Sequence, residues 1–399
     1  MIDQINIKPA SRLGEVKEYY FSQKLREIAA MRAEGKVILN LGVGSPDMAP
    51  AQEVIDELTK EIAKKENHAY QSYTGIPELR EAFAHWYKQW FAVDLDANTE
   101  ILPLIGSKEG IMHIAMTYLE AGDETLVPNP GYPTYRAVST LTGATIREYK
   151  LEEDNDWLPD LDKLEREDLS RVKIMWINYP NMPTGVQATT TFFERLIALA
   201  KKHSFLIVND NPYAFILNDK PQSILSIPGA KEVCLELNSL SKSHNMAGWR
   251  IGMLAGKSTY LQNILRFKSN MDSGMFKPIQ LAAAKALQNP SSWYTELNAV
   301  YQKRRQYVFQ LFDLLECTYS KNQTGLFVWA KVSDKYDSGY ELSDQILNKA
   351  NVFITPGGIF GSQGDKYVRI ALCSEIAVFQ EAIERCIKFH PTVSTVDLQ

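Results

Sequence analysis

The stretch Asn238–Gly252, NSLSKSHNMAGWRIG, is the part of the chain from which the rest is interpreted. It places Lys242 beside two serines, Ser239 and Ser241, and puts Arg250 eight residues further on. An amine forms an imine with a carbonyl compound, whereas hydroxyls and a guanidinium bind a phosphate dianion. The stretch therefore suits a small molecule that carries both a carbonyl and a phosphate, although a Ser-x-Ser-Lys motif taken alone is more often a solvated basic loop.

Length and composition are those of an ordinary globular protein. The chain has 399 residues, of which 45% are hydrophobic and 23% are charged, and this is enough for a large core divided between two domains. The net charge of -5 gives no broad basic surface, which argues against nucleic acid or an anionic membrane as the main partner. Small molecules are the partners that this composition favours.

Cysteine usage and the N-terminal sequence predict a cytoplasmic protein. Cys234, Cys317, Cys373 and Cys386 lie far apart without a CxxC pair, so neither a zinc site nor a disulfide framework is indicated. Residues 1–16 lack the apolar core of a signal peptide, and no apolar run approaches the ~18 residues of a membrane span. We therefore expect a reducing compartment, no bound metal and no membrane anchor.

Apolar runs alternate with helical patterns through the middle of the chain. The runs Val172–Ile177, Phe205–Val208 and Val233–Leu237 are examples, and the helical pattern Thr190–His203 separates the first two. This alternation predicts an α/β fold with a mostly parallel sheet that is covered by helices on both faces. Ligands of such sheets bind beyond the carboxyl ends of the strands.

A smaller α+β domain is expected after a long helix over Ser291–Leu315. We predict a large domain over residues 48–290 and a small domain formed by residues 1–47 and 291–399. In the predicted strand Tyr367–Leu372, Arg369 interrupts an apolar run, and a buried arginine needs an anionic partner. An internal Asp or Glu is the ordinary partner, and a substrate carboxylate is the alternative that the planar guanidinium favours.

Loops that follow predicted strands carry the other candidate groups. The strand Ile101–Ile105 breaks at Gly106, and Ser107 and Lys108 then begin a helix whose unpaired N–H groups suit phosphate. Capping of an ordinary helix by Ser107 is the alternative. The loop PNPGYPTY presents two tyrosines, including Tyr132, which either pack or stack on a planar ring.

Three later loops, NYPNMPTG, NDNPYAF and NSLSK, also follow predicted strands. In the second loop, Asp210 is able to pair with a protonated ring nitrogen, and Tyr213 is able to bond a phenolic oxygen. An aspartate after a strand is often only a cap, but three such loops at one edge of a sheet favour a shared ligand. Together with Lys242, they indicate a pyridoxal phosphate Schiff base.

Eight motifs in order carry a resemblance to a known family. They are GVGSPD, YTGIPELREAF, GSKEGI, PNPGYPTY, PNMPTG, NDNPY, SLSKSHNMAGWRIG and YVRIAL. Over essentially its whole length the chain resembles the class I and II aminotransferases, which are pyridoxal phosphate enzymes of the aspartate aminotransferase fold. GSKEGI and SLSKSHNMAGWRIG look closest to the branch that includes diaminopimelate-type and broad-specificity aminotransferases.

The resemblance implies a role for each candidate residue. It implies that Lys242 forms the internal aldimine and moves the substrate proton, that Asp210 keeps the pyridine nitrogen protonated, and that Tyr213 bonds the ring oxygen. It implies that Arg369 and the Gly44 N–H bind the substrate α-carboxylate. The remaining cofactor contacts that it implies are Ser107, Lys108, Tyr132, Ser239, Ser241 and Arg250.

Tyr70 and Met182 concern the assembly of the protein and a departure from the family motif. Tyr70 looks like the family's tyrosine that reaches the phosphate of the neighbouring subunit, which implies a homodimer with shared active sites. The family's PNNPTG has an asparagine that bonds the ring oxygen, where this chain has Met182. Methionine cannot make this bond, and Asn181, one residue earlier, is the candidate replacement.

The leading hypothesis is an aminotransferase that moves an amino group between an L-amino acid and a 2-oxo acid. Another reaction on the same imine, such as the β-elimination of a carbon-sulfur lyase, is the alternative among enzymes, because the fold alone does not separate them. A catalytically silent binding protein or regulator is the alternative outside enzymes. The complete set of Lys242, Asp210, Tyr213 and Arg369 argues against it.

Replacing Met182 by asparagine tests the departure from the family motif. With Tyr213 as the one outside donor, more negative charge remains on the ring oxygen, so the imine keeps its proton to higher pH. Met182→Asn should therefore lower the pKa of the imine, measured by spectrophotometric titration of the bound cofactor. If Asn181 already donates to the ring oxygen, the midpoint will stay unchanged or rise.

Overall fold

The largest sheet has seven strands in the order β2-β8-β7-β6-β5-β3-β4. The computed structural model describes residues 7–14, 16, 18 and 20–389. The strands are β2 (Ile101–Leu104), β3 (Glu124–Asn129), β4 (Thr145–Lys150), β5 (Val172–Ile177), β6 (Leu206–Asp210), β7 (Cys234–Ser239) and β8 (Gly252–Gly256). Neighbours are parallel except at β8, which runs antiparallel to both β2 and β7. The predicted mostly parallel sheet is confirmed.

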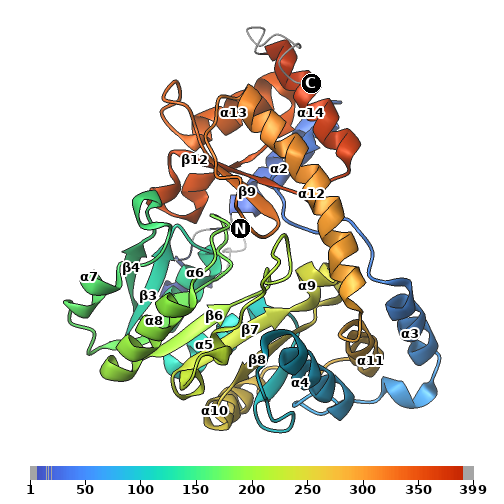
Figure 1. Cartoon of the computed structure of the whole chain (residues 1–399), viewed down its shortest axis with the longest axis vertical. Coiled ribbons are helices and arrows are strands. Elements are labelled where there is room, and N and C mark those ends of the chain that lie inside the picture. The colour runs from blue at the N-terminus through green and yellow to red at the C-terminus, as the bar shows by residue number, and fades with distance from the viewer. Residues whose placement is uncertain (1–6, 15, 17, 19, 390–399) are drawn as a thin grey trace, which may run out of the picture.

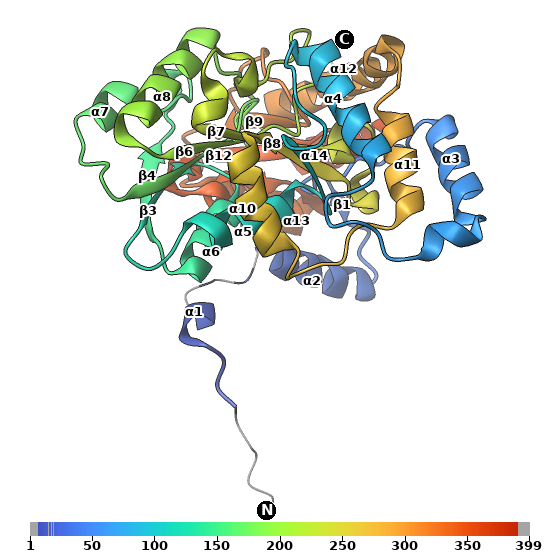
Figure 2. The ribbon, with the colours of Figure 1, turned by 90° about the horizontal axis from the view of Figure 1, so that it is seen from below.

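Helices cover both faces of this sheet (Figures 1 and 2). One core contains α5 (Ser107–Tyr118), α6 (Pro133–Thr142) and α10 (Ser258–Lys268), and the other contains α4 (Pro77–Phe91), α7 (Leu161–Glu165), α8 (Thr190–His203) and α11 (Lys277–Ala286). Within β5, Ile174 and Trp176 belong to the first core, and Met175 and Ile177 to the second. Burial on both faces explains why the strands are nearly continuous apolar runs.

A smaller part lies above the large sheet in Figure 1. It holds a three-stranded antiparallel sheet of β9 (Phe327–Lys331), β11 (Thr355–Pro356) and β12 (Tyr367–Ala371), and a parallel pair of β1 (Leu39–Asn40) and β10 (Val352–Phe353). The remaining helices are α1 (Ser11–Gly14), α2 (Tyr20–Ala33), α3 (Gln52–Ile62), α9 (Leu240–Ser243), α12 (Ser291–Leu314), α13 (Gly339–Ala350) and α14 (Ile376–Phe389). Of these, α3 packs against α11 of the large part, and the short α9 follows β7. The predicted small domain also includes residues 1–6 and 390–399, which lie outside the described residues.

Two regions differ from the prediction. The sequence analysis assigns no element to residues 252–286, which form β8, α10 and α11. The strand β8 begins and ends with glycine, which weakens strands, so its apolar pattern is not distinctive. The prediction of a loop throughout PNPGYPTY is wrong, because α6 begins at Pro133, and a helix accepts proline in its first turn.

Arg304 on α12 joins segments that are distant in the sequence. Its Nη1 and Nη2 donate to the two carboxylate oxygens of Asp47 at 2.7 and 2.8 Å, and Nη1 also donates to the Leu372 carbonyl at 2.9 Å. The side chain of Arg304 is 6% exposed. Buried charge that is paired in this two-pronged way holds the GVGSPD segment against the end of β12.

Arg304→Met should lower the free energy of unfolding by about 2–4 kcal/mol, because Asp47 and the Leu372 carbonyl lose a charged donor in a poorly hydrated place. Urea denaturation of the purified protein measures the change. Lys335→Met is the control, since the Lys335–Glu316 pair is 64% and 45% exposed and should contribute less than about 1 kcal/mol. A loss for Arg304→Met as small as that of the control would contradict the role given to Arg304.

Candidate active site

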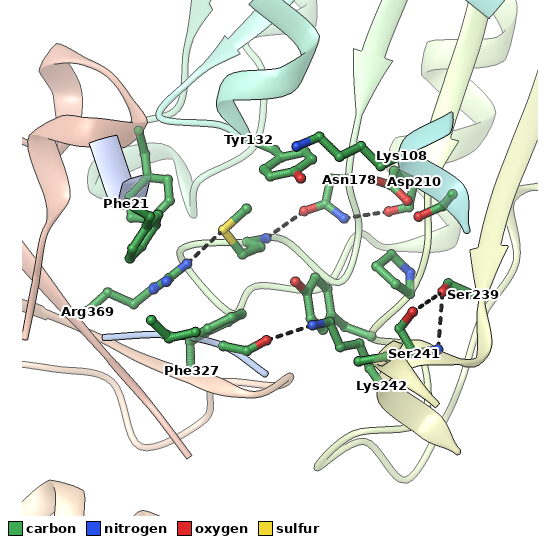
Figure 3. A pocket seen from close by; sticks show the side chains of 18 of the residues that line it. Phe21, Lys108, Tyr132, Asn178, Asp210, Ser239, Ser241, Lys242, Phe327 and Arg369 are labelled. Atoms are coloured by element: carbon green, nitrogen blue, oxygen red, sulfur yellow. Dashed lines mark hydrogen bonds between the residues drawn. The ribbon is translucent and has the colours of Figure 1, made fainter. Parts of the chain in front are cut away.

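A cavity of about 510 Å³ lies beyond the carboxyl ends of the large sheet's parallel strands (Figure 3). Residues of the smaller part, among them Phe327 and Arg369, close it from the other side. Every predicted site residue except Asn181 and Tyr70 lines this cavity. They are Gly44, Ser107, Lys108, Tyr132, Asp210, Tyr213, Ser239, Ser241, Lys242, Arg250 and Arg369.

The topology of the sheet explains this gathering. Ser107 begins α5 directly after β2, Asp210 is the last residue of β6, and Lys242 lies in α9 after β7. The parallel strands end at one edge of the sheet, so their loops meet there although they are far apart in sequence. The loop positions picked out by the sequence motifs are therefore neighbours in space.

Lys242 lies half-buried in the wall of the cavity. Its Nζ donates to the Gly44 carbonyl at 2.6 Å, which joins α9 to the GVGSPD segment. Burial lowers the pKa of Lys242, and the nearby Arg369 and Arg250 lower it further against the opposing effects of Cys373 and Asp210. A lysine with a lowered pKa holds more of the neutral amine, which is the nucleophilic form.

Asp210 is a buried carboxylate that is bonded on one side. Its Oδ2 accepts from the Tyr135 hydroxyl at 2.9 Å, while Oδ1 has no hydrogen-bond partner within the described part of the chain. Burial raises the pKa of Asp210 to about 7, although the Tyr135 hydrogen bond and the Lys242 charge act in the opposite direction. An enclosed carboxylate oxygen of this kind calls for a donor from a ligand.

Glu236 on the adjacent strand β7 shows how the fold treats a structural carboxylate. Its oxygens accept from the Tyr87 and Ser223 hydroxyls at 3.0 and 2.7 Å, from Asn209 Nδ2 at 3.0 Å and from the Ile224 N–H at 3.1 Å. Both oxygens of Glu236 are thus satisfied by the protein itself. Asp210 differs from Glu236, because its Oδ1 has no hydrogen-bond partner within the described part of the chain.

The start of α5 forms one end of the cavity. Its N-cap is Gly106, with φ of +82° and no side-chain cap, so capping by Ser107 does not occur. A Cβ on Gly106 would lie 2.3 Å from Nη2 of Arg250, so glycine is required for this approach. Backbone N–H groups at a helix start and a guanidinium against them suit a dianion.

The serines of α9 lie at the same end of the cavity. The Ser239 hydroxyl donates to Ser241 Oγ at 2.8 Å and accepts from the Ser241 N–H at 3.1 Å, which caps α9 (Figure 3). Glu109 is a residue of this end for which no role was predicted from the sequence. Its Oε2 accepts a hydrogen bond from the Ile105 N–H at 2.5 Å and so holds the turn before α5. An acidic residue in the first turn of a helix often accepts from a backbone N–H before the helix, so the position of Glu109 could have predicted this contact.

Arg369 lies at the opposite end of the cavity. Its Nη1 donates to Met182 Sδ at 3.2 Å and its Nη2 to the Gly42 carbonyl at 3.0 Å. The guanidinium carbon is 3.9 Å from the ring centroid of Phe327 and 4.6 Å from that of Phe360. A cation held between rings, a sulfur and a carbonyl keeps its charge for an anion that enters the cavity.

Asn181 does not line the cavity, which corrects its choice as a candidate. Its Nδ2 donates to the Asn178 carbonyl at 3.1 Å, and its Oδ1 accepts from the Thr184 hydroxyl at 2.8 Å. The side chain thus stabilises its own loop, in which the Met182–Pro183 peptide bond is cis. Met182 faces the cavity instead.

Two polar residues of the cavity have contacts that the sequence did not predict: Asn178 was not a candidate, and Tyr135 was expected only to pack or to stack on a ring. Asn178 follows β5 directly, and it accepts from the Met182 N–H at 2.8 Å and donates to the Asp210 carbonyl. Tyr135 holds Asp210, as described above. The rule that pointed to Asp210, a polar side chain just after a parallel strand, applies equally to Asn178.

Tyr213 and Tyr70 occupy contrasting places. Burial raises the pKa of Tyr213, so its hydroxyl keeps its proton and is a donor to the cavity. Tyr70 is 91% exposed on the surface of the chain and does not belong to the cavity lining.

Comparisons with known proteins identify the family of the chain. The model of the family "Aminotransferase class I and II" matches residues 36–385. The chain is 40% identical over 379 residues to an LL-diaminopimelate aminotransferase of Oleidesulfovibrio alaskensis, covering 94% of this chain and 97% of the relative. A relative of the same name from Moorella thermoacetica is 40% identical over 381 residues, with 95% and 97% covered.

Solved structures show the same fold. The apo-BacF structure from Bacillus subtilis superposes with a TM-score of 0.92 at 33% identity and covers 97% of this chain and 99% of its own. An aminotransferase from Staphylococcus aureus superposes with a TM-score of 0.87 at 27% identity, with 97% and 100% covered. Together with the cavity, these similarities show that the chain belongs to the class I and II aminotransferases and is a pyridoxal phosphate-dependent enzyme of that family.

Proposed function

We propose that Lys242 and Asp210 are the catalytic pair with which this enzyme moves an amino group between an L-amino acid and a 2-oxo acid. The observation that carries the proposal is that a half-buried lysine with a lowered pKa and a buried carboxylate, one oxygen of which has no partner in the described part of the chain, line one cavity. The names of the relatives make LL-diaminopimelate an amino donor to test.

The residues of the cavity fit pyridoxal phosphate. Asp210 Oδ1 would accept a hydrogen bond from a protonated pyridine nitrogen, whose positive charge would restore the ionised carboxylate. Tyr213 would donate to the ring oxygen, and Tyr132 would cover a ring face. The groups that would bind the phosphate are the start of α5 with Ser107 and Lys108, and the side chains of Ser239, Ser241 and Arg250.

The chain's own groups would divide the chemistry between them. When bound, pyridoxal phosphate supplies an electron sink for the bond that breaks at the substrate Cα. Arg369 would hold the α-carboxylate, while Lys242 Nζ would accept the proton that leaves the substrate Cα and would donate it where the new C–H bond forms. The lowered pKa of Lys242 supports this role, because a general base works best when its pKa is near the working pH.

We also propose the division into domains over residues 48–290 and over residues 1–47 with 291–399, and a cytoplasmic location. The separate sheets of the two parts and the long helix α12 between them support the division. Four buried cysteines that form no disulfide are compatible with a reducing compartment.

Borohydride reduction followed by peptide mapping tests the assignment of Lys242. The label should fall on the peptide that contains Lys242, and Lys242→Ala should lose the label and lower kcat by about 10²–10⁴-fold or more. Lys257→Ala is the control, because Lys257 is exposed outside the cavity and should keep both label and activity. A label on Lys108 or Lys268 would overturn the proposed site.

We propose that the enzyme is a homodimer with shared sites, because Tyr70 is exposed on its own chain and becomes useful only where a second chain brings it to a phosphate. Tyr70→Phe and Lys242→Ala chains should each show low activity alone. Hybrids formed by mixing them should regain activity, since one site then has both residues intact. A fully active monomer in analytical ultracentrifugation would exclude this arrangement.

A further inference from the structure

Resting on the proposed aminotransferase function, we propose that the preferred amino donor is a neutral amino acid with a large apolar side chain. The surface that would select it is formed by Phe21, Leu25, Phe327 and Phe360, and we call it the apolar wall. All four residues line the cavity. Three of them are aromatic, and aromatic rings bind apolar and aromatic side chains well.

The apolar wall stands next to Arg369. The guanidinium carbon is 3.9 Å from the ring centroid of Phe327, 4.6 Å from that of Phe360 and 5.7 Å from that of Phe21. Figure 3 shows Phe21 and Phe327 on either side of the Arg369 side chain. A substrate whose carboxylate is held by Arg369 therefore has its side chain within reach of these rings.

Helix α2 contributes one side of the apolar wall. Phe21 and Leu25 lie four residues apart, on one face of the helix. Ile28 and Met31 anchor the helix in a core that also contains Leu347. Leu25 is 42% exposed and lines the cavity, so its side chain is accessible to a ligand there.

The charged side chains of the cavity would all be used to bind the cofactor and the α-carboxylate. Its charged lining residues in the described part of the chain are Lys108, Asp210, Lys242, Arg250 and Arg369. Asp210 is the single carboxylate among them, and the cofactor nitrogen would use it. The four cations would bind the cofactor and the α-carboxylate.

With these charges used, the cavity would favour substrates whose side chains carry no charge. LL-diaminopimelate carries a second ammonium and a second carboxylate at its far end. Within the described lining that one chain provides, neither charge finds an opposite charge that is not already used. Burying an unpaired carboxylate against aromatic rings is strongly unfavourable, and a ring face offsets only part of the cost of desolvating an ammonium, whereas an apolar side chain gains from the same contact.

The first test is a panel of amino donors with a common 2-oxo acceptor. The values of kcat/KM for L-phenylalanine and L-leucine should exceed those for LL-diaminopimelate, L-lysine and L-glutamate by about 10²-fold or more. A higher value for LL-diaminopimelate would overturn the inference and leave the aminotransferase function intact. Turnover of no amino acid, with no borohydride label on Lys242, would instead overturn the proposed function.

Variants of Leu25 test whether the apolar wall selects the side chain. Leu25→Ala should lower kcat/KM for L-phenylalanine about 10-fold more than that for L-alanine, because L-alanine does not reach the wall. Leu25→Glu should lower the value for L-phenylalanine and raise it for L-lysine. Ile62→Ala is the control, since Ile62 is also apolar and 43% exposed but lies outside the cavity. Equal losses for L-phenylalanine and L-alanine in Leu25→Ala would contradict the assignment.

Binding of unreactive acids provides a readout that needs no turnover. Calorimetry of the holoenzyme should give a Kd for 3-phenylpropanoate at least about 10-fold lower than that for 6-aminohexanoate, because the first places a ring and the second an ammonium against the wall. Leu25→Ala should weaken only the binding of 3-phenylpropanoate. Equal affinities for the two acids in the wild-type enzyme would overturn the inference.

Discussion

The enclosure of Asp210 is the constraint on which the rest of the site depends. A carboxylate at the end of a central strand, with one oxygen bonded to Tyr135 and the other buried without a partner in the described part of the chain, is unfavourable unless a cation approaches it. Burial acts on Lys242 in the opposite sense, because it disfavours the charged amine. Two groups whose charged forms are both disfavoured by burial thus line one cavity, and a cofactor with a positive nitrogen would stabilise the ionised form of Asp210.

Hydrogen bonds connect the two ends of this cavity through the loop after β5. Arg369 donates to Met182 Sδ, the Met182 N–H donates to Asn178 Oδ1, and Asn178 donates to the Asp210 carbonyl. The residue at position 182 is therefore a neighbour of the carboxylate-binding arginine. Its sulfur is a weak and polarisable acceptor, so it orients the guanidinium without neutralising it.

The sequence predicted the parts of the fold and site that depend on local rules. The strands β5, β6 and β7 are continuous apolar runs, and each is followed by a polar loop, so the parallel sheet and the positions of Asp210 and Lys242 could be inferred from the chain alone. Gly106 likewise marked the start of α5.

Other features depend on packing that no local pattern encodes. From the sequence, Asn181 is a candidate to replace the asparagine that the family has at position 182. The fold of the loop instead bonds Asn181 within the loop and places Asn178 in the cavity lining. The sequence predicts that Gly44 lets a ligand approach its N–H. A Cβ at this position would lie 2.3 Å from the Phe327 ring, so glycine is also needed here for the packing of two segments that are distant in the sequence. The place of Phe21 and Leu25 depends on how α2 docks, which involves residues about three hundred positions further along the chain.

The segment around Gly42 has a consequence for how the protein is made. The Gly42 carbonyl accepts from Thr355 and Arg369, which are 313 and 327 residues away, and the Leu41 carbonyl accepts from the Ala371 N–H at 2.8 Å. Ribosomes release the early segment long before these partners exist, so Leu39 and Leu41 cannot be buried in their final place until nearly the whole chain has emerged. Completion of the active site is therefore tied to the end of synthesis, and an interrupted chain cannot assemble the carboxylate-binding half of the cavity.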